Sequence, residues 1–224
     1  AKLSAAARQR GFHIIAVDGP RNEHRPRVKT VTIDLAHQSA WEKLDAILRE
    51  PGVFAAHFAP PCGTASRARD KKVPQWMRNL GVPSPPPLRS SQFPLGIPEI
   101  TSEYQLMKLE AANSIYRLVA KGLSLCLELG IIVLIENPVR SYFWEIPFIK
   151  PFGKHKNLEW VLYDGCMVGG SRDKRSAFLA TKGVFTSLHR LCDNSHQHAT
   201  WKIELKDGIP CFDTSSEAKY PALL

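Results

Sequence analysis

The sequence has no uninterrupted apolar run of about 20 residues, the length that a membrane-spanning helix needs. Its five cysteines are an odd number without regular spacing, and no charged-then-apolar leader stands at the amino terminus, so a secreted disulfide framework is not expected. Internal repeats are also absent. We therefore expect an intracellular protein of the nucleus, nucleoid or cytoplasm, with reduced thiols and no membrane partner.

Acidic residues are in the minority. The 21 Asp and Glu face 30 Lys and Arg, which gives a formal net charge of +9 and a pI of about 9.4. Such a balance favours a polyanionic partner, and nucleic acid is the first candidate. A modestly basic surface can also serve solubility alone, so charge supports this interpretation without establishing it.

The pattern along the 224 residues predicts one α/β domain. Helical periodicity or capping signals occur in three segments, and short β-branched or apolar runs in six. The expected helices are 1–10, 41–49 and a long one between Ser102 and Gly130. The expected strands are 12–17, 28–33, the run before Cys62, 131–135, 161–163 and 177–181.

Residues 73–99 differ in composition from the rest of the chain. Seven prolines exclude long regular elements there and predict an extended loop beside the site: Pro74, Pro83, Pro85, Pro86, Pro87, Pro94 and Pro98. Loops of this length usually bind or cover something. Trp76 within it could stack on a base or only anchor the loop.

Two expected strands end at side chains that can take part in catalysis. An apolar run reaches Pro60-Pro61-Cys62, and the run 131–135 is followed by Glu136-Asn137-Pro138. Ligands and catalytic groups gather at the carboxyl ends of strands in open α/β sheets, so a thiol and a carboxylate there form a candidate reaction centre. The alternatives are a small buried thiol for Cys62 and an ion pair with Arg140 for Glu136.

Together with an arginine-bearing turn before the last strand, these motifs resemble those of the C5-cytosine DNA methyltransferases. The resemblance implies a Rossmann-like class I methyltransferase sheet with helices on both faces, and transfer of a methyl group from S-adenosylmethionine to C5 of cytosine in DNA. It implies that Cys62 adds to C6 of a flipped cytosine, that Glu136 holds N3, and that Arg172 or Arg175 contacts the ring carbonyl. The charged turn could also be solvated surface.

The same resemblance assigns binding residues. Asp18 and Asp34, which follow the second and third strands of the family pattern, would hold the cofactor with Pro60 and Pro61. Both acids could instead be turn formers. The nucleic acid, DNA first, would be contacted by the remaining residues of these motifs: Ser66, Arg67, Arg69 and Asn137.

The chain departs from the family in two informative ways. No Phe-x-Gly-x-Gly occurs, so we expect the first strand and glycine-rich loop to be missing, with an upstream segment or a partner completing the cofactor pocket. We divide the chain into a catalytic domain, 1–182, and a short segment packing on it, 183–224, too short for a separate recognition domain. Alternatives are a degenerate module that only binds nucleic acid or a partner, and a methyltransferase acting on RNA or a free pyrimidine.

A further group of residues has metal-ligand chemistry. Cys192, His196 and His198 form Cys-x3-His-x-His, and Cys166 or Cys211 could complete a tetrahedral zinc site. The spacing matches no standard zinc module, and histidines at i and i+2 converge only in a turn. The sequence therefore leaves a polar surface loop as the expectation, with zinc as the alternative.

Overall fold

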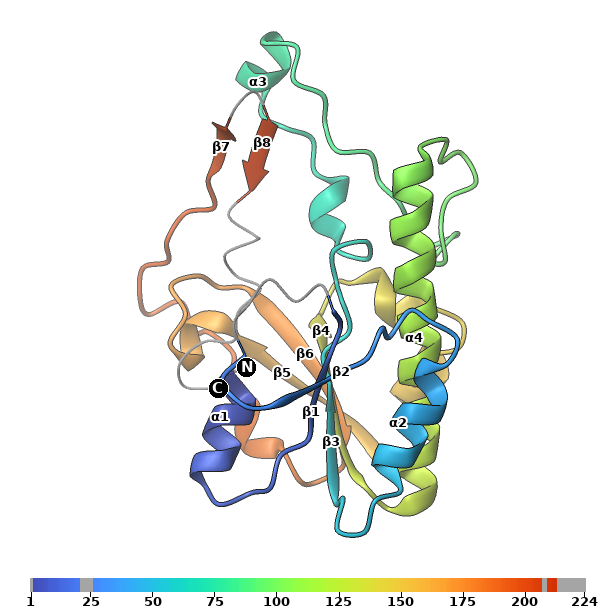
Figure 1. Cartoon of the computed structure of the whole chain (residues 1–224). Helices are drawn as coiled ribbons and strands as arrows, with labels where there is room; N and C mark the ends of the chain where they lie inside the picture. Colours follow the sequence, from blue (N-terminus) through green and yellow to red (C-terminus); the bar gives the residue numbers. More distant parts are fainter. Residues whose placement is uncertain (1, 21–25, 207–208, 213–224) are drawn as a thin grey trace.

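The computed structural model describes residues 2–20, 26–206 and 209–212, and shows a mixed α/β fold with a parallel-containing sheet (Figure 1). The α-helices are α1 (Lys2–Gln9), α2 (Ala40–Leu48), α3 (Gln75–Asn79) and α4 (Glu103–Leu129). The strands are β1 (Ala16–Asp18), β2 (Thr30–Thr32), β3 (Ala55–Phe58), β4 (Ile132–Pro138), β5 (Leu158–Asp164), β6 (Arg175–Thr181), β7 (Ile203–Lys206) and β8 (Ile209–Phe212). Short 3-10 helices are η1 (Arg67–Asp70), η2 (Tyr142–Glu145), η3 (Lys150–Lys154), η4 (Gly165–Val168) and η5 (Thr186–Leu188).

The central sheet has four strands in the order β3-β4-β6-β5. β3 and β4 are parallel, whereas β6 is antiparallel to both of its neighbours. β1 and β2 form a separate parallel pair, and β7 and β8 an antiparallel one. The parallel pairing of β3 and β4 brings the ends that precede Cys62 and contain Glu136 to the same edge of the sheet.

The long helix α4 forms because apolar side chains recur at helical spacing along one face. Leu109, Tyr116 and Leu123 on this face are buried. Gly130 ends the helix with a left-handed φ of +71°, a conformation that glycine adopts without steric cost. α4 packs with α2 on one side of the sheet, and Figure 1 shows α1 on the other side.

Strand β4 is buried on both faces, which explains its unbroken apolar sequence. Val133 and Ile135 belong to the main core with α2 and α4. The alternate residue Leu134 packs in a second core with Val161 and Phe178. Glu136 therefore lies on the face of the second core, because successive strand residues point to opposite sides.

The main expected elements occur in the expected order, and the structure adds the β7–β8 pair, which was not expected. Further differences concern single elements. β4 continues through Glu136 and Asn137 rather than ending before them, because both residues pair with β6. The helix α3 interrupts the loop 73–99, which is anchored by a set of buried apolar side chains: Val73, Met77 and Leu88. The expected strand 12–17 is shorter, since β1 begins at Ala16.

Part of the C-terminal segment packs on the sheet. The Arg190 amide donates to the Leu162 carbonyl at 3.1 Å, and the Asp164 amide donates to the Arg190 carbonyl at 2.9 Å. Residues 213–224 lie outside the described part of the chain. Among the described helices, none combines the length and apolar character needed to cross a membrane.

Candidate active site

Cys62 occupies a tight turn directly after β3. Its carbonyl accepts hydrogen bonds from the amides of Ala65, at 3.0 Å, and Ser66, at 2.8 Å. The two prolines before it are held from opposite elements: Asn137 Nδ2 donates to the Pro60 carbonyl at 3.2 Å, and Tyr116 Oη donates to the Pro61 carbonyl at 2.5 Å. The loop that carries the thiol is therefore fixed both by the end of β4 and by α4.

A buried guanidinium braces the same loop. Arg89, only 1% exposed, donates to Thr64 Oγ1 at 3.0 Å, to Asn113 Oδ1 at 2.8 Å and to the Pro94 carbonyl at 2.6 Å. It also lies over the Tyr116 ring, 5.2 Å from the centroid. Arg89 thus connects the Cys62 turn, the proline-rich loop and α4 through neutral acceptors, and burial lowers its pKa.

Glu136 is positioned by the register of β4 and β6. It pairs with Phe178, and Pro138 pairs with Ser176, so Glu136 and Ser176 are on the same face. Tyr163 pairs with Ser176 from β5 and stacks on Phe178 at 5.0 Å between ring centroids. The carboxyl thus lies at the edge of the second core.

Cys62 and Glu136 are electrostatically coupled. Burial raises the pKa of the Cys62 thiol, and the charge of Glu136 raises it further. Burial likewise raises the pKa of Glu136, whereas Lys174 and a hydrogen bond with Ser176 lower it. The pair therefore favours holding one negative charge rather than two, and protonation of either group makes ionisation of the other easier.

Lys174 is the cation of this site, and the sequence analysis missed it. Its charge lowers the pKa of both Cys62 and Glu136. Lys174 immediately precedes β6, two residues before Ser176, and its carbonyl accepts from the Gly165 amide at 2.9 Å. The lysine therefore stands at the start of the strand whose Ser176 bonds to Glu136.

Arg175, expected near the ring, is on the opposite face and pairs with Asp164. Its Nε and Nη2 donate to the two carboxylate oxygens at 2.8 and 2.7 Å, and the carboxylate is 1% exposed. The Arg175 hydrogen bonds hold the pKa of Asp164 below its usual range. Arg172 lies over the Trp201 ring at 5.1 Å and donates to the Thr200 carbonyl at 3.4 Å. These contacts favour supporting roles for both arginines.

The residues expected to contact nucleic acid beside Cys62 make internal contacts. Ser66 caps η1 by accepting from the Ala68 amide at 3.2 Å. Arg67 forms an ion pair with Glu145 and lies over the Tyr142 ring at 4.2 Å. A surface hollow of about 370 Å³ is bordered by Arg67, Val139, Arg140, Ser141, Trp144 and Glu145, without Cys62 or Glu136. Contact of Arg67 with a phosphate would require exchange of these bonds.

Arg69 and Asn137 retain unused hydrogen-bonding groups. Arg69 donates to the Pro86 carbonyl at 3.3 Å, while its buried Nε has no partner. The Asn137 side chain is fully buried, and its Oδ1 also has no partner. A buried polar atom without a hydrogen-bond partner is costly, so the described residues leave both side chains incompletely satisfied.

Asp18 is the last residue of β1, and Asp34 follows its parallel partner β2. The Gly19 amide donates to Asp18 Oδ1 at 2.8 Å, and the Ala36 amide donates to Asp34 Oδ1 at 3.1 Å. Each carboxylate therefore stabilises its own turn, and an ionised carboxylate has capacity for further bonds. Their chemistry fits the hydroxyl and amine donors of an adenosine group. Among the described residues, nothing forms a glycine-rich loop for the methionine part.

The sequence patterns favoured a polar surface loop at the candidate metal ligands, but the structure brings these ligands together. Cys192, His196 and His198 lie together, and Cys166 is the fourth member of the group. Cys211, the other candidate from the sequence, is in β8 and is not part of it. The turn 190–200 is not a strand, so the two histidines converge as the sequence analysis required.

Comparisons with protein-family models, with curated proteins and with solved structures found no match for this chain. The functional assignment therefore depends on the chemistry of the residues and on their geometry.

Proposed function

We propose that the protein transfers a methyl group from S-adenosylmethionine to C5 of cytosine in DNA. The observation that carries the proposal is the coupled pair of Cys62 and Glu136 at the ends of adjacent parallel strands, with Lys174 acting on both. A class I methyltransferase sheet is part of the same proposal. The order β3-β4-β6-β5, with only β6 antiparallel within it, is compatible with such a sheet.

Cys62 would act as the nucleophile. Its thiolate adds to C6 of the pyrimidine, the C5=C6 π bond opens, and the electron pair moves to C5. S-adenosylmethionine, when bound, supplies the methyl group that C5 attacks. Loss of the C5 proton to a solvent base and departure of the thiolate then restore the ring. Lys174 favours the thiolate, since its charge lowers the pKa of Cys62.

Glu136, with its carboxyl protonated, would hold the cytosine ring. Its raised pKa makes a neutral carboxyl accessible, and a neutral carboxyl can donate a hydrogen bond to N3 of cytosine. A hydrogen bond donated to N3 withdraws electrons from the ring and favours addition at C6. The neutral carboxyl that donates it also lacks the charge that raises the pKa of Cys62, so base binding and thiol ionisation would support one another.

A surface suited to nucleic acid lies next to this site. Figure 1 shows the loop with α3, and the β7–β8 pair, projecting beyond the end of the sheet where the chain leaves β3. Lys71 and Lys72, which directly precede the loop, and Arg78 within it are exposed, and Trp76 in the same segment is half exposed. Cations binding phosphates and an aromatic ring stacking on a base are the usual elements of such a surface.

A mechanism-based trap tests the proposal. The full 224-residue chain is incubated with S-adenosylmethionine and an oligonucleotide containing 5-fluorocytosine, whose fluorine cannot leave after methylation. We expect a covalent adduct whose mass maps to the Cys62 peptide. Cys62→Ser abolishes it, while the matched variant Cys211→Ser, which replaces another partly exposed thiol, retains it.

The other outcomes are distinct. Absence of an adduct in a protein that binds S-adenosylmethionine by calorimetry contradicts Cys62 as the nucleophile. DNA binding without either signal indicates a binding module that lacks catalysis. An adduct formed only with single-stranded RNA or a free nucleotide assigns a different pyrimidine substrate to the same chemistry.

A further inference from the structure

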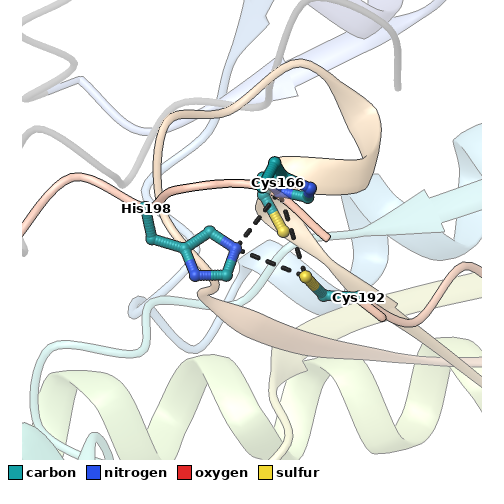
Figure 2. Close-up of side chains that lie close together, drawn as sticks. Cys166, Cys192 and His198 are labelled. Carbon is teal, nitrogen blue, oxygen red and sulfur yellow. Dashed lines mark hydrogen bonds between the residues drawn. The ribbon is translucent and has the colours of Figure 1, made fainter. Parts of the chain in front are cut away.

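We propose that Cys166, Cys192, His196 and His198 form a structural zinc site. Their potential ligand atoms all lie within 4.8 Å of one another. Figure 2 shows Cys166, Cys192 and His198 directed toward a common point from separate parts of the chain. The inference depends on these four residues alone and not on the proposed methyl transfer.

Three of the six distances between the ligand atoms are close to those of a tetrahedron around zinc. Zinc–sulfur bonds of about 2.3 Å and zinc–nitrogen bonds of about 2.0–2.1 Å place neighbouring ligand atoms about 3.3–3.8 Å apart. Cys192 Sγ lies 3.3 Å from His198 Nε2 and 3.9 Å from His196 Nε2. The two Nε2 atoms are 3.2 Å apart. Two sulfurs and two imidazole nitrogens in this geometry are typical of zinc.

The backbone around Cys192 is arranged for a thiolate. The Asn194 amide donates to Cys192 Sγ at 3.2 Å, which stabilises negative charge on the sulfur. Asn194 adopts φ of +60°, a left-handed conformation that asparagine tolerates better than most residues other than glycine. This residue lies in the turn between Cys192 and His196.

Contacts outside the four ligands hold the two halves of the site together. The Cys192 amide donates to Asp164 Oδ2 at 2.8 Å, close to the η4 turn that carries Cys166. The Ala199 amide donates to the Ser171 carbonyl at 2.8 Å. Hydrogen bonds next to the ligands help to orient them and are a regular part of metal sites.

The η4 turn is closely packed. A Cβ on Gly170 would lie 2.7 Å from the Gly165 carbonyl oxygen, which accepts from the Gly170 amide at 2.8 Å. Only glycine fits there. The chain therefore folds back immediately after Cys166, toward the loop that carries the other three ligands.

The site would be structural rather than catalytic. Four protein ligands complete a tetrahedron, which leaves no position for water or substrate. Zinc would fasten the 190–200 loop to the turn between β5 and β6. The Gly165 amide donates to the Lys174 carbonyl at 2.9 Å, so the same turn leads to the lysine of the candidate active site. Zinc binding would thereby stabilise the segment that positions Lys174.

Metal analysis of the purified chain tests the proposal. Protein that is expressed with added zinc and kept reduced is expected to contain about one zinc ion per chain, measured by inductively coupled plasma mass spectrometry. Cys192→Ala and His198→Ala are expected to lose it. Cys192→His, which replaces the thiolate with an imidazole nitrogen that can also bind zinc, retains zinc, and the matched control Cys211→Ser is unchanged.

Cobalt substitution keeps the test valid if the alanine variants do not fold. Wild-type protein depleted of metal and titrated with cobalt(II) is expected to show the intense visible bands of a tetrahedral ion and a thiolate charge-transfer band. Reduced, folded protein that takes up neither metal, a disulfide between Cys166 and Cys192 that forms in place of metal binding, or zinc that persists in both alanine variants would overturn the proposal.

Discussion

Arg175→Met separates a structural role of this arginine from the ring-contacting role that the sequence suggested. The Asp164 carboxylate is 1% exposed and receives two hydrogen bonds from Arg175 and one from the Cys192 amide. The variant leaves a buried charge with a single backbone donor. Breaking a buried pair in this way costs roughly 3–5 kcal/mol, and we expect the lower end, about 3 kcal/mol, because the arginine side chain is 48% exposed.

The assay is thermal and urea unfolding of the wild type, Arg175→Met, Asp164→Asn and the double variant. For a chain of this length, about 3 kcal/mol corresponds to a melting temperature lower by about 6–12 °C. The double variant is expected to lose less than the sum of the single variants, with a coupling energy of about 1–3 kcal/mol. The coupling identifies the pair itself rather than a general effect of losing an arginine.

Arg172→Met is the matched control in the same turn. Arg172 contacts the Trp201 ring and donates to the Thr200 carbonyl at 3.4 Å, whereas Asp164 is bonded by Arg175, so a cycle of Arg172→Met with Asp164→Asn is expected to show a coupling energy of less than about 0.5 kcal/mol. If Arg175→Met unfolds like the wild type and the cycle shows no coupling, the Arg175–Asp164 ion pair does not stabilise the fold, and the structural role of Arg175 is refuted. A selective loss of methyl transfer at unchanged stability would then restore the ring-contacting role.

Three further predictions concern the candidate active site. Burial raises the pKa of Glu136 above 4.5. The contribution of the neutral carboxyl to stability is therefore fully present below that pH and is lost as the pH rises through the folded-state pKa. Glu136→Gln is expected to be more stable than the wild type near neutral pH, while methyl transfer falls. Lys174→Met removes the charge that lowers the pKa of Cys62, so alkylation of the Cys62 peptide is expected to slow at a fixed pH. Tyr116→Phe removes the 2.5 Å bond to the Pro61 carbonyl and is expected to cost about 1 kcal/mol in urea unfolding.

Each of these has an internal reference. Glu136→Gln and the wild type must show equal stability at acidic pH, and a constant difference at all pH values would contradict the shifted carboxyl. The Cys211 peptide serves as the reference in the alkylation experiment, and equal slowing at both thiols would mean a general effect rather than loss of the Lys174 charge. Unchanged unfolding of Tyr116→Phe would mean that α4 does not hold the Pro61 carbonyl.

Local sequence patterns were sufficient for the main elements. The long helix was predicted by apolar spacing between Ser102 and Gly130, and β4 by its β-branched run, because these signals arise from neighbouring residues. The carboxyl end of β4 was misjudged. Glu136 and Asn137 do not resemble strand residues, and only pairing with β6 extends the strand through them. Such pairing connects residues about 40 positions apart and has no local signal.

The sequence by itself determined the α/β character, the order of elements and the placement of Cys62 and Glu136 at neighbouring strand ends, since periodicity and strand direction follow from local chemistry. Only the tertiary structure decided which cation serves that site: the charge of Lys174 acts on Cys62 and Glu136, whereas Arg175 pairs with Asp164. It also decided that Cys166 joins Cys192, His196 and His198. The physical reason is that these neighbours are set by packing between distant segments, which no local pattern encodes.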